Sequence, residues 1–323
     1  MNNIECPVCN ELAKGPLSSY TVEESASHVC TKERDPNRHQ RLKSVLKELW
    51  PEGKCSIYQC TNCKFGFGVP FKGGNEAYYK ILHEQMGYPK WKWDYDFGLE
   101  AISHLKAGKI LDIGAGSGYF LSALPKELTK YAIESTPITV KELEKKGIIC
   151  KSDFITLIEQ ETAQFDAITI FQVLEHISEF KDVLESCFKL LKPNGKLIIT
   201  VPNAESMFKQ ERIIGLADMP PNHINKWTIK SLQIASEQAG LKTVTTEFEP
   251  GNFDNFKAKV HMKAIALSQK KGSILNKIYQ IKSKKLRSIF LLGVSPLLII
   301  SMLKYSKFLF EGGSFSFIAV KNP

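Results

Sequence analysis

Three alternate glycines, Gly114, Gly116 and Gly118, follow a short apolar run that carries one carboxylate, Asp112. A buried strand that enters a glycine turn at a helix start lets the backbone approach a bound ligand closely. A second acidic residue, Glu134, ends the next predicted strand twenty positions after Gly114. A carboxylate at that place can accept hydrogen bonds from both ribose hydroxyls, so the pattern predicts a nucleoside-binding loop.

The details of this loop favour a cationic nucleoside over a dinucleotide. The dinucleotide fingerprint needs its third glycine one position later, where this chain has Tyr119. Asp112, just before the turn, would repel a pyrophosphate, but it would attract the ammonium and sulfonium groups of S-adenosylmethionine. We therefore expect S-adenosylmethionine as the cofactor, bound by Asp112, Gly114, Gly116, Gly118 and Glu134.

From residue 109 onward, short β-branched runs alternate with helical stretches, which is typical of a parallel sheet with crossover helices. Helices are expected at 119–128, 137–146, 180–191 and 228–239. Residues 75–105 are rich in aromatic side chains and are expected to be helical, with most rings used for packing. The seven expected strands are 109–113, 130–133, 147–151, 165–171, 195–201, 241–247 and 314–321.

These elements predict the α/β class, with a Rossmann-like seven-stranded sheet that has helices on both faces. A small zinc-ribbon-like module is expected at 1–70, and the catalytic domain at 71–323. A basic segment of about fifty residues separates the last two strands, whereas ordinary connections have about two to six. We therefore predict a basic and apolar helical insertion at 257–310, before the last strand.

Three motifs in order resemble the class I S-adenosylmethionine-dependent methyltransferases, and the resemblance runs from about Tyr78 to Lys321. The glycine loop is the first, residues 165–177 resemble the family's fourth-strand motif, and residues 190–203 resemble its fifth-strand motif. The resemblance implies methyl transfer from S-adenosylmethionine. It also places four further residues at the cofactor: Asp153 and Phe154 beside the adenine, and Gln172 and Val173 along the cleft.

Methyl transfer is an in-line displacement, so the enzyme mainly supplies alignment, water exclusion and, for a hydroxyl acceptor, a base. The catalytic candidates are Glu175, His176 and His223. The loop that holds His223 resembles an element of bacterial members related to ubiquinone-type O-methyltransferases. His223 is a base or substrate contact, or else a structural histidine that caps the helix region at Thr228. His176 is favoured as a residue held by backbone partners.

Some relatives bind a divalent metal through Glu-x-x-Glu-His at the end of the fourth strand. In this chain the first of these positions is Gln172. The change removes one charged oxygen ligand and argues against a catalytic metal.

Two Cys-x-x-Cys pairs, Cys6 with Cys9 and Cys60 with Cys63, could each give two thiolates to a tetrahedral ion. The second pair lies in a predicted hairpin at 58–67. Fifty residues separate the pairs, more than the usual spacing of about fifteen to twenty. Structural zinc is nevertheless favoured over free thiols. Four thiolates leave no open position, so the zinc would stabilise and not catalyse.

The net charge of +9 arises from one late segment. Residues 257–310 hold twelve Lys and Arg and no Asp or Glu, so the rest of the chain has a net charge of −3. A lysine-rich stretch, 270–287, precedes an apolar stretch, 288–303, that is shorter than the roughly twenty residues needed to span a bilayer. A lid over the substrate cleft is favoured. A basic amphipathic element, 270–303, resting on an anionic membrane is the alternative.

The leading hypothesis is methyl transfer to an oxygen or carbon of a small-molecule acceptor, such as a sugar, quinone-like or lipid-linked metabolite. Nucleic acid is disfavoured as a partner, because the fourth strand is not followed by the Asn/Asp-Pro-Pro-aromatic motif of base-modifying enzymes. An RNA methyltransferase that uses the zinc module and the basic insertion, and a non-enzymatic zinc scaffold, are the alternatives. No secretory signal is visible. A cytoplasmic protein is expected, at the inner face of the membrane if the membrane interpretation holds.

Overall fold

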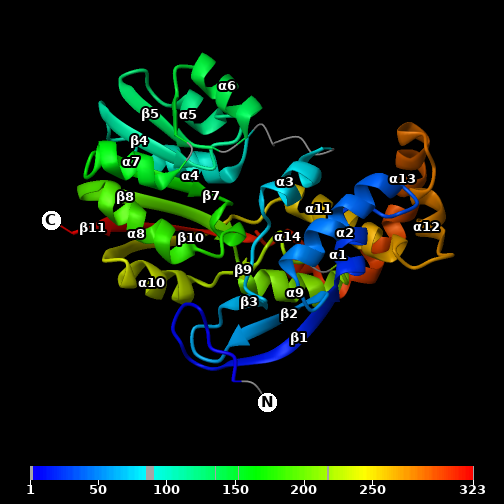
Figure 1. Cartoon of the computed structure of the whole chain (residues 1–323). Coiled ribbons are helices and arrows are strands. Elements are labelled where there is room, and N and C mark those ends of the chain that lie inside the picture. The colour runs from blue at the N-terminus through cyan, green and yellow to red at the C-terminus, as the bar shows by residue number, and fades with distance from the viewer. Residues whose placement is uncertain (1–2, 85–90, 135, 152, 217, 323) are drawn as a thin grey trace. The chain divides into compact units, whose positions relative to one another are not determined.

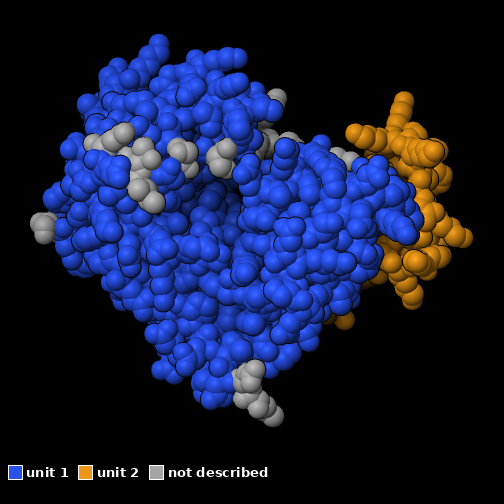
Figure 2. Space-filling view, in the orientation of Figure 1, with its two compact units in different colours: residues 1–204, 219–247, 315–323 blue, residues 205–218, 248–314 orange. Residues whose placement is uncertain are grey.

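The computed structural model describes residues 3–84, 91–134, 136–151, 153–216 and 218–322. The chain divides into two compact units, coloured separately in Figure 2. Unit 1 comprises residues 1–204, 219–247 and 315–323, and it holds two β-sheets. Unit 2 comprises residues 205–218 and 248–314 and is almost wholly helical.

The larger sheet of unit 1 has seven strands in the order β10-β11-β8-β7-β4-β5-β6 (Figure 1). Parallel pairing joins β4 with β5, β4 with β7, β5 with β6 and β7 with β8. Every predicted strand is present, so the predicted fold class is confirmed. The bounds are β4 Gly108–Ile113, β5 Leu128–Ile133, β6 Ile149–Lys151, β7 Phe165–Phe171, β8 Leu191–Pro202, β10 Leu241–Phe248 and β11 Ser314–Lys321.

Helices cover both faces of this sheet. Alternation along β4 explains the two layers, because Leu111 and Ile113 join one buried cluster and Ile110 joins another. Asp112 therefore lies on the Ile110 face. That face packs against α4 (Trp93–Ala101), α5 (Tyr119–Ala123) and α6 (Pro137–Lys145), and the other packs against α7 (Phe154–Glu161), α8 (Phe180–Leu190) and α10 (Ile229–Gln238).

Two helix predictions need correction. The helix predicted at 119–128 ends at Ala123, because Pro125 excludes the helical conformation for Leu124, which is extended at φ −72° and ψ 151°. The predicted set also lacked α7 and α9 (Ala204–Ile214). Three of the eight α7 residues are β-branched, which weakens a helical pattern in the sequence.

The smaller sheet of unit 1 has the strand order β1-β2-β3-β9. The predicted hairpin is confirmed: β2 (Lys54–Cys60) pairs antiparallel with β3 (Gly66–Val69). The fourth strand comes from far along the chain and has only two residues, too few to show a pattern. The other elements here are β1 Ala13–Thr21, β9 Asn225–Lys226, α1 Val22–Val29, α2 Pro36–Leu49 and α3 Glu76–His83.

An aromatic cluster joins the two sheets of unit 1 into one core. The ring of Phe65, fully buried, lies 4.7 Å from that of Trp227 and 6.0 Å from that of Phe180, between ring centroids. Phe180 belongs to α8 and Trp227 follows β9. The cysteine-rich module and the larger sheet are therefore parts of one folding unit.

Unit 2 contains most of the basic insertion, and the predicted helical character is confirmed. A small apolar cluster of Val260, Ala264, Leu275, Ile278 and Leu298 holds its helices together. The lid over the substrate cleft stays a prediction. The helices are α11 Phe253–Ser268, α12 Ile274–Tyr279, α13 Lys284–Met302, η2 Leu303–Tyr305 and α14 Ser306–Phe310.

We predict that Phe65→Ala lowers the free energy of unfolding by about 3–5 kcal/mol, because it opens a cavity between the two sheets. Chemical denaturation monitored by circular dichroism measures the change. Ile138→Ala, at a side chain that is 73% exposed, is the control and should stay within about 0.5 kcal/mol of wild type. An equally small effect for Phe65→Ala would show that the sheets fold independently.

Candidate cofactor and catalytic site

The glycine loop joins β4 to α5 in a conformation that only glycine adopts readily. Gly114, Gly116 and Gly118 have φ values of 72°, 50° and 70°. A Cβ on Gly114 would stand 2.6 Å from Val173, and one on Gly118 would stand 2.4 Å from Leu143. The loop can therefore turn tightly between β4 and α5 and leave its backbone open to a ligand.

Asp112 is held by the strand beside it. The register pairs Asp112 of β4 with Thr169 of β7, and the Thr169 hydroxyl donates a 2.7 Å hydrogen bond to the Asp112 carboxylate. Asp112 is only 3% exposed. Burial raises its pKa to about 7, although the hydrogen bond from Thr169 and the positive charge of Lys92 act in the opposite direction. Thr169 and Lys92 thus offset only part of the cost of burying this carboxylate.

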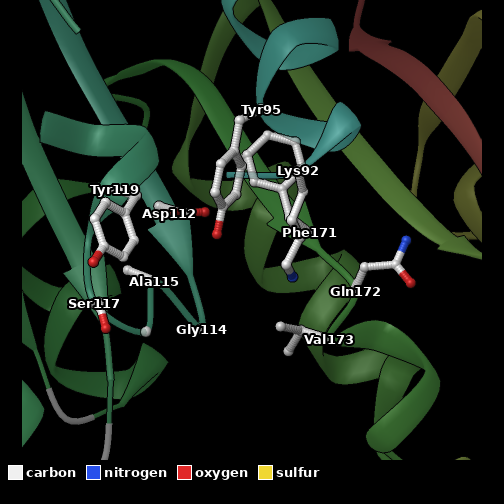
Figure 3. A pocket seen from close by; sticks show the side chains of 11 residues that line it. Lys92, Tyr95, Asp112, Gly114, Ala115, Ser117, Tyr119, Phe171, Gln172 and Val173 are labelled. Carbon is white, nitrogen blue, oxygen red and sulfur yellow. The ribbon is translucent and has the colours of Figure 1, made fainter. Parts of the chain in front are cut away.

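A pocket opens beside this carboxylate and encloses about 480 Å³ of empty space, part of it open to solvent. Figure 3 shows the Lys92 amine, the Tyr95 hydroxyl and the Asp112 carboxylate converging on it. Its lining is Lys92, Tyr95, Asp112, Gly114, Ala115, Gly116, Ser117, Tyr119, Phe171, Gln172 and Val173.

Five of the nine predicted cofactor residues line this pocket: Asp112, Gly114, Gly116, Gln172 and Val173. Glu134 lies next to it, because its carboxylate accepts hydrogen bonds from the backbone N–H groups of Gly116, at 3.2 Å, and Thr136, at 3.0 Å.

The remaining three predicted residues lie outside the pocket lining. Gly118 is the N-cap of α5. Asp153 and Phe154 stand where α7 begins, just after β6. Their contact with the adenine stays a prediction.

Several lining residues were not predicted. Lys92 and Tyr95 belong to the aromatic-rich segment, whose rings were expected mainly to pack. Tyr95 does both, since its ring lies 5.6 Å from that of Phe171 and also borders the pocket. Tyr119 was noted only as a departure from the dinucleotide pattern. Tyr119 directly follows Gly118, so the sequence offered a signal for it, whereas Tyr95 stands 13 residues before β4. For both tyrosines, spacing alone cannot separate packing from binding.

The side chain of Gln172 is hydrogen-bonded to Asp94 within the protein. Its amide donates a 3.1 Å hydrogen bond to the carboxylate of Asp94, a residue that is 5% exposed. The Gln172 backbone has φ 56°, which is rare for a residue with a side chain. The position that carries the first glutamate in metal-binding relatives is thus occupied by a hydrogen-bond donor.

The three catalytic candidates come together at the carboxyl end of β7. The Oε1 atom of Glu175 lies 3.9 Å from Nε2 of His176 and 4.0 Å from Nε2 of His223. Glu175 is 1% exposed, and burial raises its pKa to about 7 while the positive charge of His223 lowers it. The two histidines are partly exposed. The buried carboxyl group of Glu175 therefore lies close to two imidazoles that are partly exposed to solvent.

His176 has the backbone partner that the structural interpretation requires. Its Nδ1 lies 2.5 Å from the carbonyl oxygen of Asn222, so Nδ1 carries a proton and donates it, and Nε2 faces Glu175. Thr228 and Ser231 cap the start of α10 reciprocally, and the role of His223 stays a prediction.

The segment with His223 is tied down by long-range contacts. The buried side-chain amide of Asn225, in β9, donates to the carbonyl oxygens of Leu174, at 3.1 Å, and Ile177, at 2.6 Å. These two residues flank Glu175 and His176. Pairing of β9 with β3 extends the connection to the small sheet. The cysteine-rich module thus helps to fix the catalytic candidates.

The four predicted zinc ligands converge. Sγ atoms are 3.7 Å apart for Cys6 and Cys63, 3.4 Å for Cys9 and Cys60, and 3.6 Å for Cys9 and Cys63. Zn–S bonds of about 2.3 Å in a tetrahedron place neighbouring sulfur atoms roughly 3.8 Å apart, whereas a disulfide needs about 2.05 Å. The donor set fits a tetrahedral metal.

Each cysteine pair also has the turn of a zinc knuckle. The residue after each pair, Asn10 or Lys64, has φ 61°. Backbone N–H groups of Asn62 and Cys63 point at Sγ of Cys60, both at 3.4 Å. Such N–H groups stabilise a thiolate, which is the form of cysteine that binds metal.

A family model described as a methyltransferase domain matches residues 90–246, which include the pocket and all three catalytic candidates. A ubiquinone biosynthesis O-methyltransferase from Histophilus somni (strain 2336) is 33% identical over 107 residues, 29% of this chain and 45% of the relative. One from Pseudomonas putida (strain GB-1) is 26% identical over 136 residues, 40% of this chain and 56% of the relative. The chain spans about half the length of these curated relatives.

The fold was also compared with solved structures. A SAM dependent methyltransferase from Archaeoglobus fulgidus is 19% identical, with a TM-score of 0.46, and the match covers 76% of this chain and 100% of that one.

We predict that the purified chain contains one tightly bound zinc ion, measured by elemental analysis. Cys6→Ser and Cys60→Ser should each lose the zinc and lower the Tm, because three thiolates hold the ion far less well than four. Cys150→Ser, at a half-buried thiol outside the cluster, should keep both. Full zinc retention in both cluster variants would contradict the assignment.

The raised pKa of Asp112 predicts that cofactor affinity depends on pH. Only the carboxylate attracts the cofactor's positive groups, so binding must release the proton that Asp112 holds below pH 7. Affinity for S-adenosylmethionine, measured by calorimetry, should fall by up to about tenfold per pH unit below this value. Asp112→Asn should weaken binding by roughly 100-fold at pH 8.

Two controls accompany this measurement. Methylthioadenosine, which lacks the amino-acid part and the sulfonium charge, should bind with little pH dependence. Asp182→Asn, at an exposed carboxylate on α8, should bind the cofactor as wild type does. Near wild-type affinity in Asp112→Asn would remove Asp112 from the site.

Proposed function

Because residues 90–246 form a class I S-adenosylmethionine-dependent methyltransferase domain, we propose that this chain methylates an oxygen or carbon of a small-molecule acceptor. The acceptor classes are sugars, quinone-like compounds and lipid-linked metabolites. The buried carboxylate of Asp112 beside the pocket is the observation that carries the proposal, since a cationic ligand compensates for the cost of burying it.

The pocket supports the cofactor part of the proposal. Asp112 would bind the amino-acid end of S-adenosylmethionine, and the glycine loop and Glu134, beside Gly116, would hold its ribose. The aromatic rings of Tyr95 and Phe171 would exclude water. The cofactor would supply the methyl group, and the residues of the chain would supply alignment.

We assign the proton transfer to His223. A hydroxyl acceptor loses its proton as its oxygen attacks the methyl group, and an imidazole is a suitable base near neutral pH. His223 becomes positively charged in this step, and the Glu175 carboxylate 4.0 Å away stabilises that charge. His176 positions Glu175 from the other side. An acceptor that reacts through carbon needs a base for the same reason.

The comparisons favour oxygen among the possible acceptors. The curated relatives carry names that describe O-methyl transfer in ubiquinone biosynthesis. The methyltransferase family model matches the part of the chain that holds the pocket and the histidines.

The donor set at Glu175, His176 and His223 offers one carboxylate and two imidazoles within 4.8 Å. A hard divalent cation prefers more oxygen ligands, and Gln172 donates its hydrogen bond to Asp94. We therefore assign these side chains to proton transfer. Activity that survives chelation of divalent ions supports this assignment, and activity restored only by an added ion contradicts it.

Transfer of a labelled methyl group tests the function itself. Incubation of the chain and labelled S-adenosylmethionine with a cell metabolite extract should give a labelled compound of low molecular mass. Asp112→Asn should abolish the label. Label in RNA would support the alternative acceptor, and the absence of label in any fraction would contradict the proposed activity.

We predict that His223→Ala lowers kcat for the acceptor found in this way by about 10²–10⁴-fold, the usual contribution of a general base. Cofactor affinity should not change, because His223 does not line the pocket. His104→Ala, at an exposed histidine, should leave both values unchanged. A kcat near wild type in His223→Ala would assign His223 to structure.

A further inference from the structure

Unit 2 exposes an apolar face on α13 that its own core does not use. Leu286, Ile289, Phe290, Leu297 and Ile300 are 46–70% exposed. Their spacing of i, i+3, i+4, i+11 and i+14 places them on one face of a helix, together with Gly293. Contiguous exposed apolar surfaces of this kind mark interaction sites.

The opposite face of α13 explains why the helix still folds onto unit 2. Leu298 and Met302 are buried, and Leu291 and Val294 pack against the cluster of Val260 and its neighbours. The helix thus has two apolar faces, one satisfied within unit 2 and one exposed. The packed face is sufficient to hold α13 on unit 2. The apolar character of the exposed face therefore needs another explanation.

Positive charges flank the exposed face at both ends. Lys282, Lys284, Lys285 and Arg287 stand at the start of α13, and Lys304 and Lys307 follow its end. All but Arg287 are exposed. No acidic residue occurs between 257 and 310. The charge pattern is complementary to a surface that is negative at its border and apolar beneath it, which describes an anionic lipid bilayer.

We propose that the exposed face of α13 and its flanking lysines dock unit 2 on the surface of an anionic membrane. The apolar side chains enter the boundary between headgroups and acyl chains, and the lysine amines contact lipid phosphates and carboxylates. The axis of α13 lies parallel to the bilayer. The inference is independent of the methyl acceptor.

The topology argues for lying on the membrane and against crossing it. Residues 284–310 are long and apolar enough to span by length and composition, and 11% of their most apolar window is buried. The insertion, however, leaves from β10 and returns through β11, which are neighbours in one sheet. The two ends of the insertion must therefore lie on the same side of a bilayer, which would require an even number of crossings. Among the described residues, only this segment meets the criteria for a span.

Flotation of the full chain with lipid vesicles tests the proposal. Vesicles that contain phosphatidylserine and phosphatidylglycerol should carry the protein upward at low salt, and vesicles of phosphatidylcholine alone should not. Raising the salt should reduce binding, because screening weakens the contribution of the lysines. Binding should be the same with and without S-adenosylmethionine.

Paired substitutions separate the two contributions. Two double variants should each lower binding to anionic vesicles by roughly tenfold or more. One combines Ile289→Asn with Leu297→Asn, and the other combines Lys284→Gln with Lys285→Gln. Two control double variants change exposed residues of the same kinds on unit 1. They are Ile138→Asn with Val244→Asn, and Lys47→Gln with Lys126→Gln. These controls should bind as wild type does. All eight positions are exposed, and an unchanged Tm verifies folding.

Four results would overturn the proposal. The first is no flotation with anionic vesicles at low salt. The second is equal flotation with neutral vesicles. The third is self-association that the Ile289 and Leu297 substitutions abolish, without vesicle binding, which would assign the face to a second copy of this chain. The fourth is RNA binding through the lysines without vesicle binding.

Discussion

The burial of the Asp112 carboxylate is the interaction on which the site depends. Its position on β4, opposite Thr169 of β7, removes it from water, and burial raises its pKa to about 7. The hydrogen bond from Thr169 and the positive charge of Lys92 offset only part of this cost. A ligand that brings positive charge next to Asp112 stabilises the ionised form. Binding of such a ligand therefore compensates for the free-energy cost of burying the carboxylate. The glycine loop allows a ligand to come that close.

The cysteine cluster and the catalytic candidates are connected through one short strand. The four thiols hold the hairpin of β2 and β3, and β3 pairs with β9. Asn225 in β9 then fixes the turn that contains Glu175. His223 lies two residues before β9. The cysteine cluster therefore helps to position the three catalytic candidates, although it lies outside the pocket.

The sequence predicted the parts of the fold that local pattern controls. Seven β-branched runs and the glycine loop with Asp112 were identified, because each is a property of a few consecutive residues. Thr169, the partner of Asp112, was not, since register between parallel strands is decided by tertiary packing. Glu175, His176 and His223 were named separately, but the contact between them depends on β9, two residues without a pattern. Tyr95 looked like a packing residue because aromatic rings serve both purposes.

The ionisation of Asp112, followed by carbon-13 NMR of its carboxyl group, tests this account most directly. In the free protein the resonance should titrate with a midpoint of about 7. Saturation with S-adenosylmethionine should move the midpoint to lower pH by about two units, the shift that a roughly 100-fold preference of the cofactor for the carboxylate requires. The same midpoint with and without cofactor would show that Asp112 does not bind its positive charge.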